Sequence, residues 1–321
     1  MVKTEITATS ALGLPAWQLT SPTGAQALIS ERGAALLSWQ PTPEAELIRG
    51  YATAEELFAG VGARGIVMAP WAGAMTWASY RFDGQSYSVP VEACTNGLAY
   101  AHDFHATATD STLSLTTSIE PTDAYPWSCE ISAHYSLDSG SDGEEHLSLT
   151  VWARNTSDRP APITLGWHPY INLPARASIS NLAVRVPART KILTDHFGVP
   201  LPGESAQSGV SNPVEIDYIG ARRLDDFYRD LVPDSYGVVT TRVSDPASSA
   251  SIELTQEPGE APVVHVYSGD NLEREPRSAL ALAPMSHVPD AFNRPDSAGD
   301  VCVAPGQLRQ MTATLTYRVN S

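Results

Sequence analysis

Apolar and polar residues alternate in many short stretches of the chain. Residues 113–116, 147–152 and 311–317 each carry an apolar side chain at about every second position. A repeat of two is typical of β-strands that bury one face and leave the other exposed. The pattern therefore predicts a protein built from many short strands.

Turn and cap signals lie between these stretches. The chain contains 25 Pro and 22 Gly, which are spread along its length. Asp83-Gly84 predicts a tight hairpin over residues 81–89, because these residue types accept the positive φ of such a turn. Residues 53–58 are a candidate short helix, since a Thr followed three residues later by Glu has the spacing of a capping box. Residues 202–212 are polar and rich in Gly and Ser, so we expect an exposed loop there.

The composition fits one folded unit. The chain has 321 residues, of which 42% are hydrophobic and 17% charged. This is enough apolar material for a large core and too little charge for a disordered tail or a coiled coil. No internal repeat, low-complexity tract or clear boundary divides the sequence. We therefore expect a single all-β domain over residues 1–321.

The charge balance narrows the class of partner. The chain has 20 Lys and Arg against 36 Asp and Glu, which gives a net charge of −16. An acidic surface repels phosphate backbones and anionic lipid, so neither nucleic acid nor a membrane is expected as a partner. No stretch approaches the roughly 18 apolar residues of a membrane span. The amino terminus also lacks an apolar signal segment, so we expect a cytoplasmic protein.

The cysteines and the standard motifs point away from metal and nucleotide chemistry. Cys94, Cys129 and Cys302 are far apart and form no pair or Cys/His cluster with zinc-ligand spacing. We expect them to be buried structural thiols and expect no metal site. Gly-rich phosphate loops, a G-x-S-x-G elbow and an H-E-x-x-H motif are also absent.

Residues 166–170 combine groups that sugar sites use. They read Gly-Trp-His-Pro-Tyr. The rings of Trp167 and Tyr170 offer faces for pyranose C–H groups, and the imidazole of His168 offers a polar group beside them. From the residues alone, an ordinary core histidine at a strand end is the alternative interpretation of His168.

Two further segments carry titratable groups. His102 and His105 flank an aspartate, but residues three apart in a strand face opposite sides, so a shared metal is not expected. His105 alone fits an ordinary exposed histidine. Asp225 and Asp226 are adjacent, so at most one is expected to face a given site. A turn or a helix cap is the alternative for this pair.

Taken in order, these segments resemble the aldose 1-epimerase (galactose mutarotase) family from about residue 25 to 317. Each motif alone is weak, and the ordered set is fairly specific. The resemblance implies a large antiparallel β-sandwich, the galactose mutarotase-like supersandwich, with a sugar cleft on its concave face. The motifs that carry it are Ala69-Pro70-Trp71, Tyr80-Arg81-Phe82-Asp83-Gly84, residues 165–170, Leu224-Asp225, Pro284-Met285 and Pro289-Asp290-Ala291-Phe292.

The resemblance also implies a mechanism. In that family a glutamate removes the proton of the anomeric hydroxyl while a histidine protonates the ring oxygen, which interconverts α and β anomers of free aldoses without metal or organic cofactor. His168 matches the general acid. Positions expected to contact the sugar, a small-molecule partner, are His102, Asp225, Trp167, Tyr170 and Trp71.

Two departures from the family pattern bear on activity. Gly73-Ala74 stand where the family has an Asn-Arg pair that contacts sugar, and Ala283 stands at the position of the catalytic glutamate. Alanine cannot accept a proton, and general base assistance is typically worth about 10²–10⁴-fold in rate. Asp103 and His287 lie next to motif positions and are candidates for a substitute base.

Three functions remain open on the sequence. The first is an epimerase of a free aldose, an isomerase that uses an unconventional base. The second is a non-catalytic carbohydrate binder or sensor on the same fold. The third is a hexose-phosphate epimerase, for which Arg64, Arg222 and Arg223 are candidate phosphate ligands, because Arg forms bidentate contacts with oxyanions.

Overall fold

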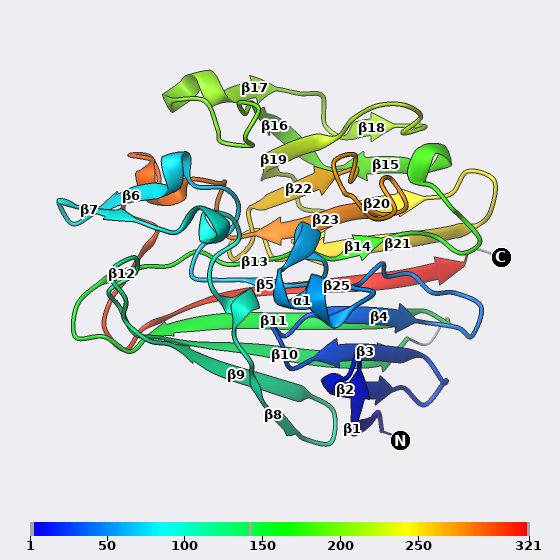
Figure 1. Ribbon diagram of the computed structural model, residues 1–321. Coiled ribbons are helices and arrows are strands. Elements are labelled where there is room, and N and C mark those ends of the chain that lie inside the picture. Colours follow the sequence, from blue (N-terminus) through cyan, green and yellow to red (C-terminus); the bar gives the residue numbers. More distant parts are fainter. Residues whose placement is uncertain (1–2, 141–142, 320–321) are drawn as a thin grey trace.

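The structure is a computed structural model that describes residues 3–140 and 143–319. Most of the chain lies in antiparallel β-strands, as Figure 1 shows, and the all-β prediction is confirmed. The predicted hairpin forms from β6 (Ser79–Phe82) and β7 (Gln85–Ser88). The predicted short helix is α1 (Ala54–Phe58), in which the Thr53 hydroxyl accepts a hydrogen bond from the Glu56 N–H.

Two large sheets carry most of the strands (Figure 1). The first has nine strands in the order β18 (Val214–Ile216), β15 (Ala183–Val186), β20 (Val239–Ser244), β21 (Ala250–Gln256), β25 (Leu308–Val319), β11 (Glu145–Asn155), β10 (Cys129–Ser139), β9 (Leu113–Ile119) and β8 (His105–Ala108). The second has eight strands: β17 (Gln207–Gly209), β16 (Ala188–Ile192), β19 (Asp225–Leu231), β22 (Val263–Tyr267), β23 (Leu280–Met285), β13 (Gly166–Trp167) and β5 (Val67–Met68) in that order, with β14 (Tyr170–Ile171) also paired to β23.

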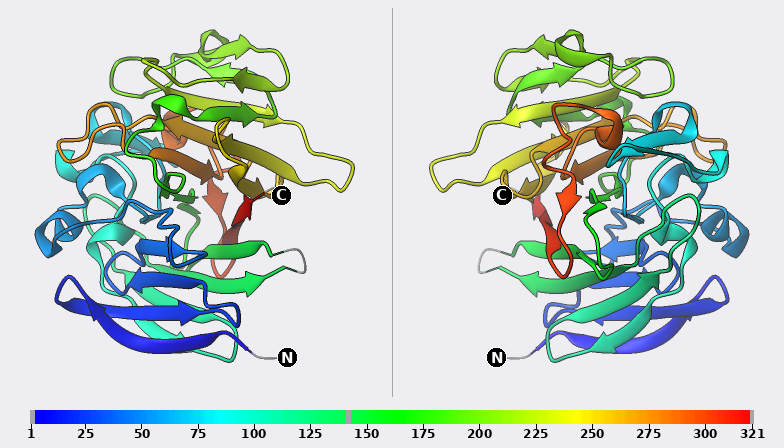
Figure 2. Two further views of the ribbon diagram at one scale, coloured as in Figure 1. Left: turned by 90° about the vertical axis from the view of Figure 1, so that its right-hand side faces the viewer. Right: turned by 90° about the vertical axis from the view of Figure 1, so that its left-hand side faces the viewer.

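Smaller elements complete the architecture. A four-stranded sheet lies at one end of the molecule, opposite β17 (Figure 2). Its strands are β1 (Glu5–Ala11), β2 (Leu14–Thr20), β3 (Gln26–Ser30) and β4 (Leu36–Gln40). A two-stranded pair joins β12 (Ala161–Pro162) to β24 (Cys302–Val303). Single 3-10 turns are η1 (Val61–Ala63), η2 (Thr76–Ala78), η3 (Val91–Ala93), η4 (Ala99–Ala101), η5 (Ile179–Asn181), η6 (Gly203–Ala206) and η7 (Ala291–Asn293).

The two large sheets bury their facing sides in one hydrophobic core. Leu149 and Leu315 of the nine-stranded sheet belong to the same buried cluster as Val264 and Leu282 of the eight-stranded sheet. The opposite face of the nine-stranded sheet is polar, as the alternation predicts. Across β11 and β25, for example, the hydroxyls of Ser148 and Thr314 are 2.8 Å apart. The two large sheets therefore share one core.

Strand β23 is buried on both faces, and this determines where the site forms. Leu280 and Leu282 point into the core between the sheets. Because successive side chains of a strand point to opposite faces, Ala281 and Ala283 point to the other side. That second side is also covered, since all six residues of β23 are buried. The loops that cover it enclose the candidate site.

Two predictions of local structure are wrong. Residues 202–212 are not a plain exposed loop, because they contain η6 and β17, and Ala206 is completely buried. The three cysteines are not all buried thiols: Cys129 is buried, whereas Cys94 is partly exposed and Cys302 exposed. Within the two described ranges, none of the helices is both long and apolar enough to span a bilayer.

Asn155 joins the end of β11 to two loops through three hydrogen bonds. Its side chain is completely buried. The Nδ2 group donates to the carbonyl oxygens of Arg159, at 2.8 Å, and Val303, at 2.9 Å. The Oδ1 atom accepts from the N–H of Ser157 at 2.9 Å. Removing the amide would take these bonds from three backbone groups, of which the Val303 oxygen is bonded in a buried position and the other two in partly buried positions, and this is costly.

We therefore expect Asn155→Ala to lower the free energy of unfolding by about 2–4 kcal/mol. The exposed Asn181 provides the control, and Asn181→Ala is expected to change it by no more than about 0.5 kcal/mol. Denaturant-induced unfolding followed by tryptophan fluorescence measures both. Equal stability of the two variants would contradict the structural role of Asn155.

Candidate active site

A break between β13 and β14 presents His168. Pro169 has no N–H to donate, so the ladder with β23 is interrupted there. The backbone at His168 instead bonds to the loop before β5: its N–H donates to the Ile66 oxygen at 3.1 Å, and its oxygen accepts from the Gly65 N–H at 2.8 Å. Alternation then sends Trp167 into the core and His168 to the opposite side.

The pairing of three neighbouring strands places two histidines on either side of Ala283. Strands β13 and β14 pair with β23 in one continuous register, so that His168 lies level with Ala283. On the other side of β23, Ala283 pairs directly with His265 of β22. The centroids of the two imidazole rings are 5.9 Å apart, and the ring planes are inclined at 43°. Ala283 beneath them is completely buried.

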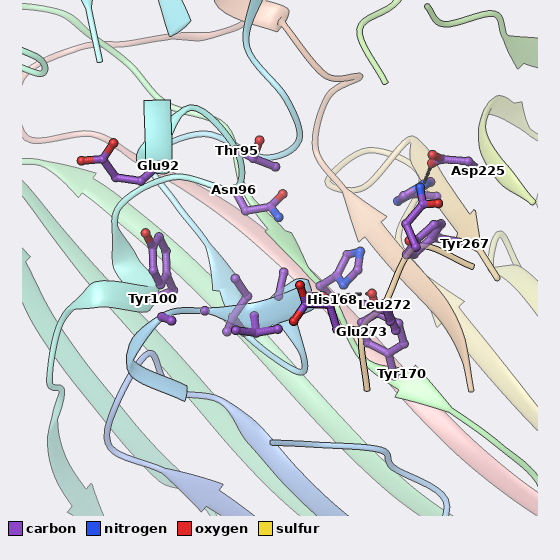
Figure 3. Close-up of a pocket in the computed structure, with 18 residues that line it drawn as sticks. Glu92, Thr95, Asn96, Tyr100, His168, Tyr170, Asp225, Tyr267, Leu272 and Glu273 are labelled. Carbon is purple, nitrogen blue, oxygen red and sulfur yellow. Dashed lines mark hydrogen bonds and ion pairs between the residues drawn. The ribbon is translucent and has the colours of Figure 1, made fainter. Parts of the chain in front are cut away.

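A cavity of about 480 Å³ opens above these rings. Figure 3 shows His168 between Glu92, Asn96 and Tyr100 on one side and Asp225, Tyr267 and Tyr170 on the other. The lining residues are Ala59, Gly60, Val61, Gly62, Ala63, Ile66, Glu92, Thr95, Asn96, Tyr100, His168, Tyr170, Asp225, His265, Tyr267, Asn271, Leu272 and Glu273. The volume is ample for a monosaccharide, and the lining combines aromatic rings with amide, hydroxyl and carboxylate groups.

His265 is held by two neighbours on β19. Its Nε2 atom lies 2.8 Å from Oδ1 of Asp225. Its ring stacks on Phe227, with centroids 3.9 Å apart and an angle of 8° between the planes. Asp225 and Phe227 share one face of β19 because they are two residues apart. The next carboxylate, Asp226, faces the other way and binds Lys191 at 2.6 Å, as expected for adjacent carboxylates in a strand.

Burial dominates the electrostatics of His168. Its side chain is 6% exposed, and its Nδ1 atom has no hydrogen-bond partner within the described part of the chain. Burial lowers the pKa of His168 to about 3, and the adjacent His265 lowers it further, while Ala63 and Asp225 oppose the shift weakly. The imidazole is therefore neutral near pH 7 and carries one ring hydrogen.

Tyr170 forms part of the cavity wall beside His168. Its ring lies 5.1 Å from the His168 ring, and its hydroxyl donates to the Gly62 oxygen at 2.9 Å. On the far side, the guanidinium of Arg64 lies 5.2 Å from the Tyr170 ring. Arg64 itself is buried and donates to two backbone oxygens, those of Arg49 and Arg274.

The sequence-predicted residues separate into two groups in space. His168, Tyr170 and Asp225 line the cavity together. Trp167 and Trp71 do not. Trp167 is completely buried and packs on Tyr135, with ring centroids 6.3 Å apart, so it has no free face for a sugar.

Trp71 and His102 are also set apart from the cavity. Trp71 is 3% exposed and packs between Tyr125 and Phe292. His102 follows η4 and does not belong to the cavity lining, although Tyr100 of the same turn does. Burial lowers the pKa of His102, and the nearby Arg32 adds to the effect. A direct sugar contact by Trp71, Trp167 or His102 is therefore not supported by their positions.

The two candidates for a substitute base lie outside the cavity lining. Asp103 is exposed and pairs with Arg32 at 3.5 Å. His287 is partly buried, and its Nδ1 atom lies 3.0 Å from the hydroxyl of Ser286. Burial lowers the pKa of His287 to about 3, with a further contribution from Arg309. Neither side chain faces the position of Ala283 in the way that His265 does.

Sequence reasoning missed His265, the residue that pairs with Ala283 across β22 and β23. His265 lies within the stretch Val-Val-His-Val-Tyr, which is buried at four of its five positions. A titratable ring inside a hydrophobic strand was the available signal, because such groups are seldom buried without a partner. Among residues 3–140 and 143–319, no group of three or more His, Cys, Asp or Glu side chains could hold a metal ion.

Comparison with known proteins extends these observations. The sequence profile described as aldose 1-epimerase matches residues 15–317. The chain belongs to the aldose 1-epimerase family. It is also similar to the protein YihR of Escherichia coli (strain K12), with 26% identity over 235 residues, which is 71% of each chain.

Solved structures of similar fold agree with this membership. The GalM/aldose epimerase homologue from C. elegans has a TM-score of 0.79 at 18% identity, covering 99% of this chain and 100% of the other. Galactose 1-epimerase from Lactobacillus acidophilus NCFM has a TM-score of 0.76 at 15% identity, with 100% of both chains covered. At these identities the likeness shows the shared fold, the galactose mutarotase-like sandwich.

In this aldose 1-epimerase family member, Gly65 lets the backbone pass close to β4. Its N–H there donates a hydrogen bond to the His168 oxygen. Its φ is +71°, and a Cβ atom there would lie 2.1 Å from the Leu36 oxygen. We expect Gly65→Ala to lower the free energy of unfolding by more than about 2 kcal/mol. Gly84 is the matched control: its φ is +75° but no atom lies within 4 Å, so Gly84→Ala should cost only about 1 kcal/mol. Equal losses in denaturant unfolding would rule out the steric effect.

His287 makes stability depend on pH. Its pKa of about 3 in the folded state lies below the value of about 6.5 for an unfolded chain, so unfolding takes up a proton between these values. The stability that the neutral ring contributes is present above about pH 6.5 and is lost as the pH falls toward 3. We expect His287→Gln to reduce the loss of unfolding free energy between pH 7 and pH 5 by up to about 2 kcal/mol.

Denaturant unfolding at pH 7 and at pH 5 measures the loss of unfolding free energy for each protein. Because each variant is compared with itself at two pH values, its absolute stability does not enter. His196 is exposed, and His196→Gln serves as the control. A pH dependence that is the same in wild type, His287→Gln and His196→Gln would show that His287 does not contribute.

Proposed function

We propose that this protein binds a free aldose in the cavity above His168 and interconverts its α and β anomers. One observation carries the proposal: the buried imidazole of His168 lines a cavity of about 480 Å³ in a chain of the aldose 1-epimerase family.

The cavity wall offers suitable contacts for a pyranose. Asp225 uses Oδ1 to hold His265, and its second oxygen makes no hydrogen bond among the described residues, so it can accept one from a sugar hydroxyl. The amides of Asn96 and Asn271 can both donate and accept. The rings of Tyr267 and Tyr100 provide apolar surface for C–H groups. Such a mixture is typical of sugar sites.

His168 supplies the hydrogen for the ring oxygen in this proposal. Opening a pyranose requires a proton to leave O1 and a proton to reach O5, which calls for two groups near the O1–C1–O5 unit. Since burial lowers its pKa to about 3, His168 rests as a neutral ring and must take up a second proton from solvent before it can protonate O5.

The charge of the cavity favours an uncharged substrate over a hexose phosphate. Glu92, Asp225 and Glu273 are carboxylates of the lining, and the lining residues include no Lys or Arg. Arg64 lies behind Tyr170, and its guanidinium donates hydrogen bonds to the backbone oxygens of Arg49 and Arg274. Arg223 binds Asn271 at the edge of the cavity, at 3.0 Å. A phosphate would therefore meet more negative than positive charge inside the cavity.

A non-catalytic carbohydrate binder is the second candidate, and Ala283 favours it. The position of the family glutamate carries a completely buried methyl group that cannot accept a proton. The same cavity and the same contacts would then serve recognition alone. The two candidates share the binding step and differ in turnover.

Exchange spectroscopy by NMR on D-glucose and D-galactose distinguishes the candidates. We expect the protein to accelerate anomer exchange above the rate in buffer, and His168→Gln to reduce the enzymatic rate by about 10²–10⁴-fold. His196→Gln should match the wild type. Binding of either sugar is followed separately by isothermal titration calorimetry.

The outcomes separate cleanly. Sugar binding with exchange no faster than in buffer would favour the non-catalytic binder. Tighter binding of glucose 6-phosphate than of glucose would favour a hexose-phosphate substrate. Absence of binding for all free aldoses tested would defeat the proposal.

A further inference from the structure

We propose that His265 is the base that takes the anomeric proton in place of the missing family glutamate, with Asp225 as its positioning residue. This inference rests on the proposed function, because it names the second proton-transfer group of the same site. It follows from the arrangement of the sheet and does not depend on either of the bases considered from the sequence.

Position is the first argument. His265 is the direct partner of Ala283 across β22 and β23, so its Cβ atom starts about 5 Å from the alanine methyl. Its ring lines the cavity, and the ring of His168 is 5.9 Å away. The small side chain at 283 leaves the space above β23 to the two imidazoles. A hemiacetal lying above Ala283 can therefore contact both.

Orientation is the second argument. A carboxylate oxygen only accepts hydrogen bonds, so the 2.8 Å contact with Asp225 assigns the ring hydrogen of neutral His265 to Nε2. The other nitrogen, Nδ1, then carries the lone pair that can accept a proton. Among the described residues no hydrogen bond uses this atom. The carboxylate also stabilises the imidazolium that forms when Nδ1 is protonated.

Rigidity is the third argument. The His265 ring lies parallel to Phe227 and 3.9 Å from it, and it is anchored by Asp225 on the same strand. Both neighbours belong to a sheet rather than to a loop, which favours accurate positioning. The other carboxylates of the lining, Glu92 and Glu273, are exposed residues of loops and lack such support.

The proton balance closes with the two histidines alone. At rest each neutral imidazole holds one ring proton; before the ring opens, His168 takes up a second proton from solvent, so that the pair holds three, two on His168 and one on Nε2 of His265. The proton of O1 passes to Nδ1 of His265 while the O1–H electron pair forms the C1=O1 bond. The C1–O5 bond breaks, its electron pair moves to O5, and O5 takes a proton from His168. The pair again holds three protons, and reclosure on either face of C1 reverses both transfers.

The test measures turnover and binding separately in wild type and in His265→Gln. Anomer exchange of D-glucose and D-galactose is followed by NMR, and affinity by calorimetry. We expect the variant to bind the sugar within about threefold of the wild type and to exchange anomers about 10²–10⁴-fold more slowly, as for loss of a general base. His287→Gln, which alters a histidine outside the cavity, should exchange at the wild-type rate.

Several results would overturn the assignment of His265. Exchange within about threefold of wild type in His265→Gln would show that another group is the base. A loss of binding as large as the loss of exchange would make it a binding residue only. Wild-type protein that binds sugar without exchange would overturn the inference while leaving the binding part of the proposed function intact. Protein that binds no aldose would defeat both.

A second measurement needs no substrate. Nitrogen-15 spectra of labelled histidine identify the tautomer of His265, with His265→Gln used to assign the signals. We expect hydrogen on Nε2 and a free Nδ1 in the wild type, and loss of this preference in Asp225→Asn because an amide can also donate. Hydrogen on Nδ1, or an unchanged tautomer in Asp225→Asn, would overturn the positioning role of Asp225.

Discussion

The register between β23 and its two neighbours is the constraint on which the site depends. A strand buried on both faces cannot shift by one residue, because every leucine that faces the core would then exchange places with an alanine. The fixed register puts Ala283 level with His168 on one side and with His265 on the other. The geometry of the cavity floor is therefore set by the same packing that stabilises the sandwich.

The polar groups buried at the cavity floor affect both the stability of the fold and the chemistry of the site. The His168 side chain is kept neutral by its surroundings, while His265 is satisfied by a carboxylate. Keeping an unpartnered nitrogen of His168 in a buried position costs stability, which is common for groups retained for function. The acidic net charge of the chain continues into the cavity, where the only lining residues that can become cationic are histidines. This combination suits uncharged sugars.

The sequence predicted the strands well, because they depend on local pattern. Period-two stretches became β9, β11 and β25. His168, Tyr170 and Asp225, which the sequence offered as site residues, line one cavity. Trp167 was misjudged as a sugar platform, because adjacent residues of a strand face opposite sides and its neighbour His168 takes the cavity side.

The role of His265 could not be predicted in the same way. Its contact with Asp225 joins strands 40 residues apart in sequence, and its relation to Ala283 depends on which strands pair and in which register. The burial of Ala206 at the end of η6 was also not predicted. Its neighbours in sequence are polar and suggested an exposed loop, but tertiary contacts bury the residue. In each case the missing information was long-range pairing rather than residue chemistry.

A crystal structure of the protein soaked with D-glucose or D-galactose is the most direct test of the central claim. The account predicts a pyranose above Ala283, with its ring oxygen within hydrogen-bond distance of the imidazole of His168 and its anomeric hydroxyl within that distance of His265. A sugar bound elsewhere on the molecule, with this cavity holding only water, would contradict it.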